Sequence, residues 1–294
     1  MSIKQSQKTG ITLLRASTLE PLPWLIHCFS TRSGGFSRAY RGNALNLGFT
    51  KEDSRADVER NRTAFLQKLG AVEGKKNWPL VTLRQIHSDL IHLVSGPVNH
   101  PLAGDGMVTA TPGILLAIQT ADCLPIILAD AKLLAIGVFH AGWRGTVKRI
   151  AEKGVGEMHR WFGSSPRNLR AAIGPGEHNC CYEVGPEVRS QFESQFAYAE
   201  TLFHEVEESD PVREKYPMLS LTARAPGHSE LPKKIYLDLA EANRRQLLDV
   251  GVAAKNIHVS PLCTVCHSNL FFSYRAEKGK TGRLMAVAGI RDRR

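Results

Sequence analysis

Three short strand-like segments of this chain each end on a residue type that binds transition metals. They are residues 81–86 before His87, residues 118–122 before Cys123, and residues 133–139 before His140. Largely apolar runs of this length, bounded by Gly, Pro and Asp, predict buried β-strands. Because folds built of helices and strands place their sites at the ends of buried strands, the three residues are candidates for one common site.

Two histidines and one cysteine form a ligand set suited to zinc, since zinc prefers neutral imidazole and thiolate. Three protein ligands leave the fourth position open, which is typical of catalytic rather than structural zinc. The same residues have a second interpretation, in which Cys123 is a nucleophile and His140 its base. Asp122 is expected either to orient a ligand imidazole or to act as a general base.

The remaining pattern predicts an α+β fold, with a single domain over residues 1–294 and mixed β-sheets flanked by helices. Further strands are expected at 25–31, 90–95, 113–120, 124–129, 171–173, 271–275 and 284–290, and helices at 53–69, 146–162 and 237–250. Several adjacent strands with few helices between them do not fit a regular alternation of strand and helix. Residues 193–232 are polar and contain proline, and we expect an exposed insertion there.

Composition narrows the function classes. The 294 residues include no run of 18 apolar ones and no secretory signal, so we expect a cytoplasmic protein with reduced thiols and no membrane partner. The formal net charge of +10 would suit acidic partners. Because the basic residues are scattered and no nucleic-acid motif is visible, we expect no specific nucleic-acid binding.

Two glycine-flanked turns each carry an arginine, namely Arg32 before Gly34 and Arg144 between Gly142 and Gly145. Glycine lets a backbone approach a ligand, and a guanidinium group binds phosphate or carboxylate through two parallel hydrogen bonds. We therefore expect an anion-binding element near the site.

The segment from Cys263 through Cys266 to His267 has the C-x-x-C-H pattern of covalent haem attachment. We reject this interpretation because haem is attached outside the cytoplasm and the chain shows no export signal. As metal ligands, the two thiols lack a matching second C-x-x-C, and the adjacent Cys180 and Cys181 are not expected to bind one ion together.

The motifs of this chain and their order along the sequence resemble those of the YfiH/YlmD-type family, whose members are also called laccase-domain or polyphenol-oxidase-like proteins. The similarity covers about residues 25–290 of the chain. The matching motifs are Phe29-Ser30-Thr31-Arg32-Ser33-Gly34-Gly35, Leu45-Asn46-Leu47-Gly48, Gln85-Ile86-His87, Asp105-Gly106-Met107-Val108-Thr109, Thr120-Ala121-Asp122-Cys123-Leu124-Pro125, His140-Ala141-Gly142-Trp143-Arg144-Gly145, Ile173-Gly174-Pro175, Tyr182-Glu183-Val184, Cys263-Thr264 and Phe272-Ser273-Tyr274-Arg275.

The resemblance implies one zinc ion on His87, Cys123 and His140, and purine nucleoside chemistry. The implied reactions are phosphorolysis of adenosine, inosine, guanosine and S-methyl-5'-thioadenosine, and deamination of adenosine to inosine. Some members instead edit peptidoglycan precursors by hydrolysing UDP-N-acetylmuramoyl-L-serine, which stays an alternative. The older name of the family, copper polyphenol oxidase, fits less well, because a multicopper oxidase needs several His-x-His pairs and this sequence contains none.

With this chemistry, the partners are purine nucleosides and inorganic phosphate. We expect Arg32, Asn46 and Arg144 to bind substrate or phosphate, and Asp122 to handle the proton. The catalytic residues are then Asp122 and the three zinc ligands.

Overall fold

Two six-stranded sheets form the centre of the larger of two compact units, which comprises Met1–His178 and Leu239–Arg294. The computed structural model describes residues 2–5, 10–74, 76–98, 100–207, 215 and 233–292. The first sheet has the order β1 (Ser2–Gln5), β2 (Thr12–Arg15), β3 (Leu25–Ser30), β18 (Leu284–Ile290), β10 (Leu115–Thr120) and β7 (Leu80–Thr82). The second has the order β17 (Ile257–Val259), β13 (Leu169–Ile173), β11 (Leu124–Asp130), β12 (Ala135–Ala141), β9 (Gly106–Thr109) and β8 (Ile91–Leu93).

Both sheets are mixed. Most neighbouring strands are antiparallel, but β7 runs parallel to β10, and β17 and β8 run parallel to β13 and β9. The smaller elements of this unit are β4 (Ser33–Ser37), β5 (Val72–Glu73), β6 (Lys76–Asn77), and the short helices η1 (Pro166–Asn168) and η3 (Ala254–Asn256). The prediction of an α+β fold with mixed sheets is confirmed.

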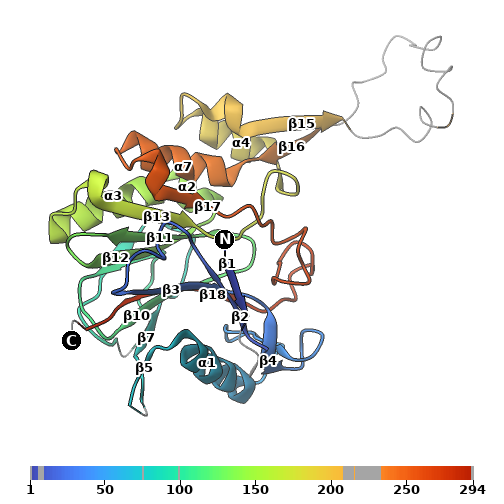
Figure 1. Ribbon diagram of the computed structural model, residues 1–294. Coiled ribbons are helices and arrows are strands. Elements are labelled where there is room, and N and C mark those ends of the chain that lie inside the picture. The colour runs from blue at the N-terminus through green and yellow to red at the C-terminus, as the bar shows by residue number, and fades with distance from the viewer. Residues whose placement is uncertain are drawn as a thin grey trace, which may run out of the picture. The chain divides into compact units, whose positions relative to one another are not determined.

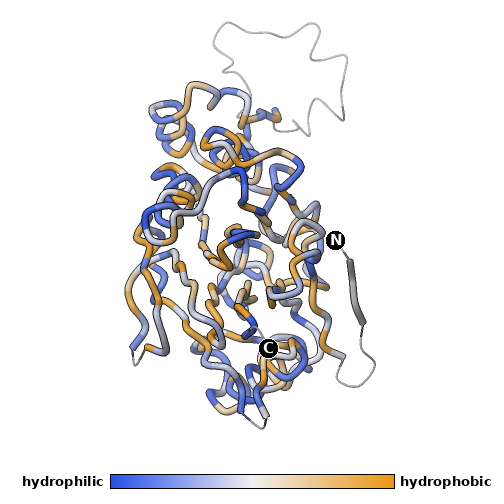
Figure 2. The backbone as a smooth tube through the Cα atoms, turned by 60° about the vertical axis from the view of Figure 1, so that its left-hand side comes forward, coloured by the Kyte–Doolittle hydropathy of each residue, from blue (hydrophilic) through white to orange (hydrophobic). Residues whose placement is uncertain are grey.

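The sheets pack face to face, with helices on both outer surfaces (Figure 1). α1 (Arg55–Leu69) covers the first sheet, whereas α3 (Ile150–Phe162) and α7 (Leu239–Asp249) cover the second. Along β10, Leu116 points into the core between the sheets and its neighbour Leu115 into the core beneath α1. This alternation follows from the two-residue period of a strand. Figure 2 shows hydrophobic and hydrophilic residues mixed along the helices, as expected where one face is buried.

Strands β11, β12 and β18 are buried along their whole lengths. Because such strands have both faces covered, their sequences are continuous apolar runs rather than alternating ones. The predicted strands at 124–129 and 284–290 are therefore confirmed, whereas the strand predicted at 133–139 begins and ends two residues later, as β12. The predicted helix at 53–69 is confirmed as well, and the hydroxyl of Ser54 caps its first turn by accepting from the N–H of Asp57.

The predicted helix at 146–162 is two helices, α2 (Trp143–Val147) and α3. Arg149 separates them with a left-handed backbone, φ 65°. Thr146 is held here from α7, because the side chain of Asn243 donates to its hydroxyl and that of Gln246 to its carbonyl. These long-range bonds explain why the helix is interrupted between α2 and α3 although the helical spacing of apolar residues continues through the sequence.

The predicted strand at 271–275 is wrong. Phe271 and Phe272 are buried, but Arg275 lies in a turn. The carbonyl of Phe271 accepts from the Arg32 guanidinium, and the N–H of Arg275 donates to Asp122, so backbone groups of this segment bond to side chains. Strand β9, by contrast, was not expected from the sequence.

The smaller unit, Asn179–Asp238, contains a three-stranded sheet of order β14 (Glu183–Val184), β16 (Lys233–Leu237) and β15 (Phe203–Glu207). Its helices are α4 (Pro186–Glu193) and the short η2 (Ala199–Leu202). Most of the expected insertion at 193–232 lies outside the described residues. Its exposure, like the prediction of one domain over residues 1–294, stays a prediction.

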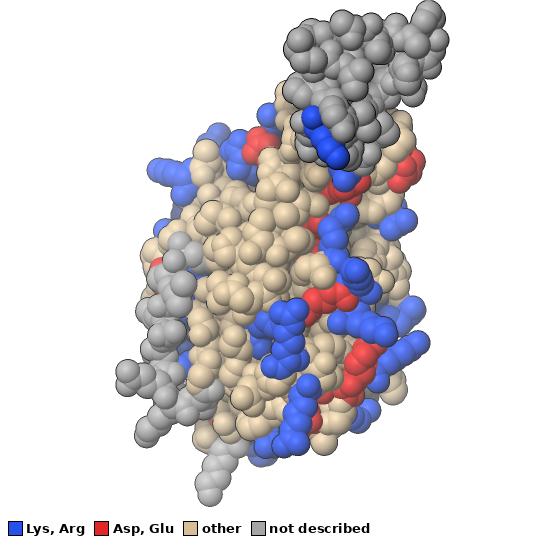
Figure 3. Space-filling view, turned by 90° about the vertical axis from the view of Figure 1, so that its right-hand side faces the viewer, with Lys and Arg blue, Asp and Glu red and all other residues tan. Residues whose placement is uncertain are grey.

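On the face drawn in Figure 3, Lys and Arg side chains are interspersed with acidic ones rather than joined into a continuous basic surface. Among the described residues, no helix combines the length and the apolar composition needed to cross a membrane.

Candidate metal centre

The ligand atoms of His87, Cys123 and His140 lie within 4.8 Å of one another. Strand pairing explains this for two of them. β11 and β12 are antiparallel with Pro125 opposite His140, so Cys123, just before β11, lies beside the end of β12. His87 comes from the loop between β7 and β8, and its ring meets that of His140 edge to face at a centroid distance of 4.9 Å. The structure therefore brings together the three residues expected to bind metal.

A buried carboxylate, Asp105, orients both histidines. It precedes β9, which pairs with β12, and its Oδ1 lies 2.8 Å from Nδ1 of His140. The same oxygen accepts from the backbone N–H of His87 at 3.1 Å, and Oδ2 accepts from the N–H and hydroxyl of Ser88. These bonds hold His87 in a left-handed conformation, φ 56°. With Nδ1 bonded to Asp105, Nε2 of His140 is the nitrogen left to bind a metal.

The electrostatics of the centre favour the deprotonated thiol. Burial disfavours every charged form here, but interactions among the groups outweigh it. Hydrogen bonds from His140 and Ser88 lower the pKa of Asp105 to about 2. Interaction with His140 and His87 lowers the pKa of Cys123, and Cys123 with Asp105 raises the pKa of His140. The centre thus holds two acidic groups beside two imidazoles, a set that suits a divalent cation.

Gly142 keeps the space beside this set open. A Cβ atom at this position would lie 3.1 Å from Sγ of Cys123 and 3.2 Å from Cδ2 of His87. A side chain there would crowd two of the three candidate ligands. The donor set and this space fit a single metal ion.

Within the part of the chain that the structure describes, Asp122 forms no hydrogen bond to a histidine. Its carboxylate accepts from the Thr264 hydroxyl at 2.7 Å and from the Arg275 N–H at 2.8 Å, and its backbone is left-handed, φ 93°. Its carbonyl accepts from the N–H of Glu177 at 2.7 Å. Asp122, just before Cys123, therefore links three distant segments, whereas Asp105 performs the orienting role that the sequence analysis considered for Asp122.

Glu177 is a second carboxyl group near the centre that sequence reasoning missed. Its side chain is 4% exposed and forms an ion pair with Arg275. Burial raises its pKa to about 8, although Arg275 opposes the shift, and the charges of Asp122 and Cys123 add to it. The carboxyl group of Glu177 therefore binds a proton at a higher pH than an ordinary glutamate does. Its place just after the Ile173-Gly174-Pro175 motif was the only signal available in the sequence.

The three expected substrate-binding residues lie in different settings. Arg144 is exposed, with its guanidinium carbon 4.3 Å from the centre of the Trp143 ring. Arg32 is buried and donates to the carbonyls of Ser268 and Phe271 and to Glu277.

Asn46 is fully buried and bonds to Gly48, Asp53 and Arg283. Arg32 and Asn46 thus have scaffold contacts, and phosphate binding by them stays a prediction.

The whole chain is similar to several known proteins. Residues 26–291 match the family described as multi-copper polyphenol oxidoreductase laccase. A purine nucleoside phosphorylase of Deinococcus radiodurans is 37% identical over 96% of this chain and 94% of its own length. A protein named adenosine deaminase RL5, from an unknown prokaryotic organism, is 36% identical over 61% of this chain and 59% of its own length. The crystal structure of Bacillus licheniformis YfiH superposes with a TM-score of 0.79 at 29% identity, covering 98% of this chain and 99% of that one.

Proposed function

This chain belongs to the YfiH/YlmD-type laccase-domain family, and we propose that it is a zinc-dependent enzyme of purine nucleosides. The observation that carries the proposal is the convergence of His87, Cys123 and His140 within 4.8 Å. Relatives named purine nucleoside phosphorylase and adenosine deaminase support the substrate class. We propose phosphorolysis of adenosine, inosine, guanosine and S-methyl-5'-thioadenosine as the main activity, with deamination of adenosine as a second one.

His87, Cys123 and His140 would hold one zinc ion. Zinc bound there supplies a Lewis acid that makes a water molecule nucleophilic near neutral pH, as deamination requires. Asp105 keeps His140 in the tautomer that leaves Nε2 available to the metal. Cys123 contributes a thiolate, since its neighbours lower its pKa.

Phosphorolysis places two further demands on the protein. A phosphate oxygen bonds to the anomeric carbon of the ribose while the bond from that carbon to the base breaks, and the departing base needs a proton or a hydrogen bond. We propose that phosphate binds to Arg144, whose side chain is exposed and which follows strand β12, the strand that carries His140. We assign the proton to two carboxyl groups near Cys123, those of Asp122 and of Glu177, whose pKa is raised.

Incubation of the protein with adenosine, with and without inorganic phosphate, tests the function directly. We expect adenine and ribose 1-phosphate only when phosphate is present, and some inosine in both cases. Hydrolysis of UDP-N-acetylmuramoyl-L-serine with no reaction of adenosine would instead identify a peptidoglycan-editing enzyme. Several coppers per chain together with rapid phenol oxidation would identify a polyphenol oxidase.

A further inference from the structure

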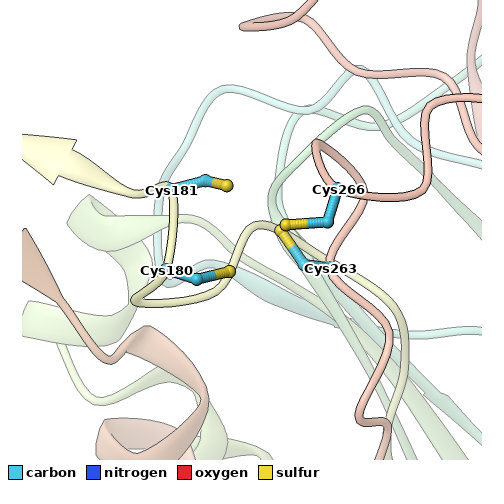
Figure 4. Close-up of side chains that lie close together, drawn as sticks. All are labelled: Cys180, Cys181, Cys263 and Cys266. Atoms are coloured by element: carbon cyan, nitrogen blue, oxygen red, sulfur yellow. The ribbon is translucent and has the colours of Figure 1, made fainter.

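Four cysteines outside the His87 centre form a second group of metal-binding side chains. The sulfur atoms of Cys180, Cys181, Cys263 and Cys266 all lie within 4.8 Å of one another. Figure 4 shows the side chains extending from two turns of the chain, two from each, toward a common centre. We propose that these four thiolates hold a structural zinc ion, distinct from the ion at His87, Cys123 and His140.

Chain connectivity helps to bring the two turns together. Gly176 forms a parallel bridge with Cys263, and its carbonyl accepts from the N–H of Thr264 at 2.9 Å. Cys180 follows Gly176 by four residues, and four residues of chain span at most about 14 Å. The first pair of thiols is thus tethered close to the second by a short covalent path.

The local conformation of each turn suits metal binding. Residues 179–181 form a turn, and Figure 4 shows that the side chains of Cys180 and Cys181 extend to the same side. The sequence analysis did not expect these adjacent residues to bind one ion together, and in an extended strand their side chains would indeed point to opposite faces. Cys263 and Cys266 have the C-x-x-C spacing found in structural zinc sites, and residues 264–270 are in turns.

The distances also agree with zinc. A tetrahedral site with zinc–sulfur bonds of about 2.3 Å has its sulfur atoms about 3.8 Å apart. The four sulfurs, at 4.8 Å or less, need only a small contraction to reach it. Four thiolates leave no open position on the ion, so this zinc would stabilise the fold rather than activate water.

Such an ion would support the neighbouring centre. Thr264, next to Cys263, donates its hydroxyl to Asp122, which precedes Cys123. Zinc on the Cys263 turn would therefore restrain the loop that holds Asp122 in its left-handed conformation. Cys180 and Cys266 are exposed, which gives the ion a path from solvent.

Zinc analysis of the full chain and of matched variants tests the proposal. We expect two zinc ions per chain in the wild type and in the control Cys28→Ala, which removes a thiol buried beneath α1. The double variants Cys180→Ser/Cys181→Ser and Cys263→Ser/Cys266→Ser should each retain one. Cys123→Ala should also retain one, and this variant keeps the test independent of whether the double variants fold.

X-ray absorption at the zinc edge of Cys123→Ala gives the deciding readout, since only the second site should then be loaded. We expect four sulfur neighbours at about 2.3 Å and no nitrogen or oxygen neighbours. A zinc-free Cys123→Ala protein, a shell containing nitrogen or oxygen, or the recovery of these cysteines as disulfides in a non-reduced peptide map would each overturn the proposal. None of these results bears on whether the enzyme acts on nucleosides, so the two proposals fail separately.

Discussion

Replacing Asp105 with asparagine should disable the metal centre without touching a ligand. An amide offers one oxygen and one NH2 group where the carboxylate offers two oxygens. If the NH2 takes the place of Oδ2, it faces the N–H groups of Ile86 and Ser88. If it takes the place of Oδ1, it faces the N–H of His87 and Nδ1 of His140. In the first orientation the N–H groups of Ile86 and Ser88 and the hydroxyl of Ser88 lose their acceptor, and in the second the N–H of His87 loses its acceptor while His140 changes tautomer.

A donor left without an acceptor costs about 1–3 kcal/mol, and the second orientation leaves the fewest such donors, so we expect Asp105→Asn to lower the free energy of unfolding by about 1–3 kcal/mol. The second orientation also turns His140 to the tautomer with its proton on Nε2, which removes the lone pair that binds metal. Loss of a carboxylate that orients a ligand histidine typically weakens metal binding roughly 10–100-fold. We expect that loss here, with a parallel loss of nucleoside turnover.

Urea denaturation and competition with a zinc chelator measure the two effects. Asp89→Asn is the matched control, because Asp89 lies on the loop that carries His87 but forms only partly exposed ion pairs with Lys148 and Lys153. Such pairs contribute about 0–1 kcal/mol, so the control should keep its zinc and nearly all its stability. Zinc affinity of Asp105→Asn within twofold of the wild-type value would refute the orienting role.

Three further predictions concern single side chains. Cys123→Ala should lose both adenosine reactions while keeping the far-UV circular dichroism of the wild type, and activity that survives this change and chelation would contradict the zinc mechanism. Arg144→Met should raise the KM for phosphate roughly 10- to 150-fold, because a charged contact to phosphate is lost. The control Arg160→Met removes a similar arginine, which stacks on Trp161 as Arg144 does on Trp143, and should leave this KM unchanged. Equal phosphate dependence of the two variants would show that phosphate binds elsewhere. The pKa of Glu177 is raised to about 8 from an ordinary value of 4.5, so between these two pH values the folded state binds more protons than the unfolded state. Wild-type stability should therefore fall relative to Glu177→Gln as pH rises from about 4.5 to 8, and parallel urea denaturation curves across that range would show that Glu177 ionises normally.

The sequence by itself was enough to identify the core strands and to single out the three residues that the fold brings together as a candidate metal centre. β11, β12 and β18 lie between covering layers, so their residues are apolar except for Asp130 and His140 near the strand ends, and this is a local pattern. His140 sits at the end of β12 and Cys123 just before β11, positions that this pattern marks directly. Local composition and period therefore sufficed wherever burial on both faces shaped the sequence.

Tertiary contacts decided what the local pattern could not show. The break at Arg149 depends on bonds from α7 to Thr146, and the loop at 271–275 on bonds to Arg32 and Asp122. Asp105 orients His140 from 35 residues away, because β9 pairs with β12. Periodicity describes which face of an element is buried but not which distant element covers it, so such partners become visible only once the chain has folded.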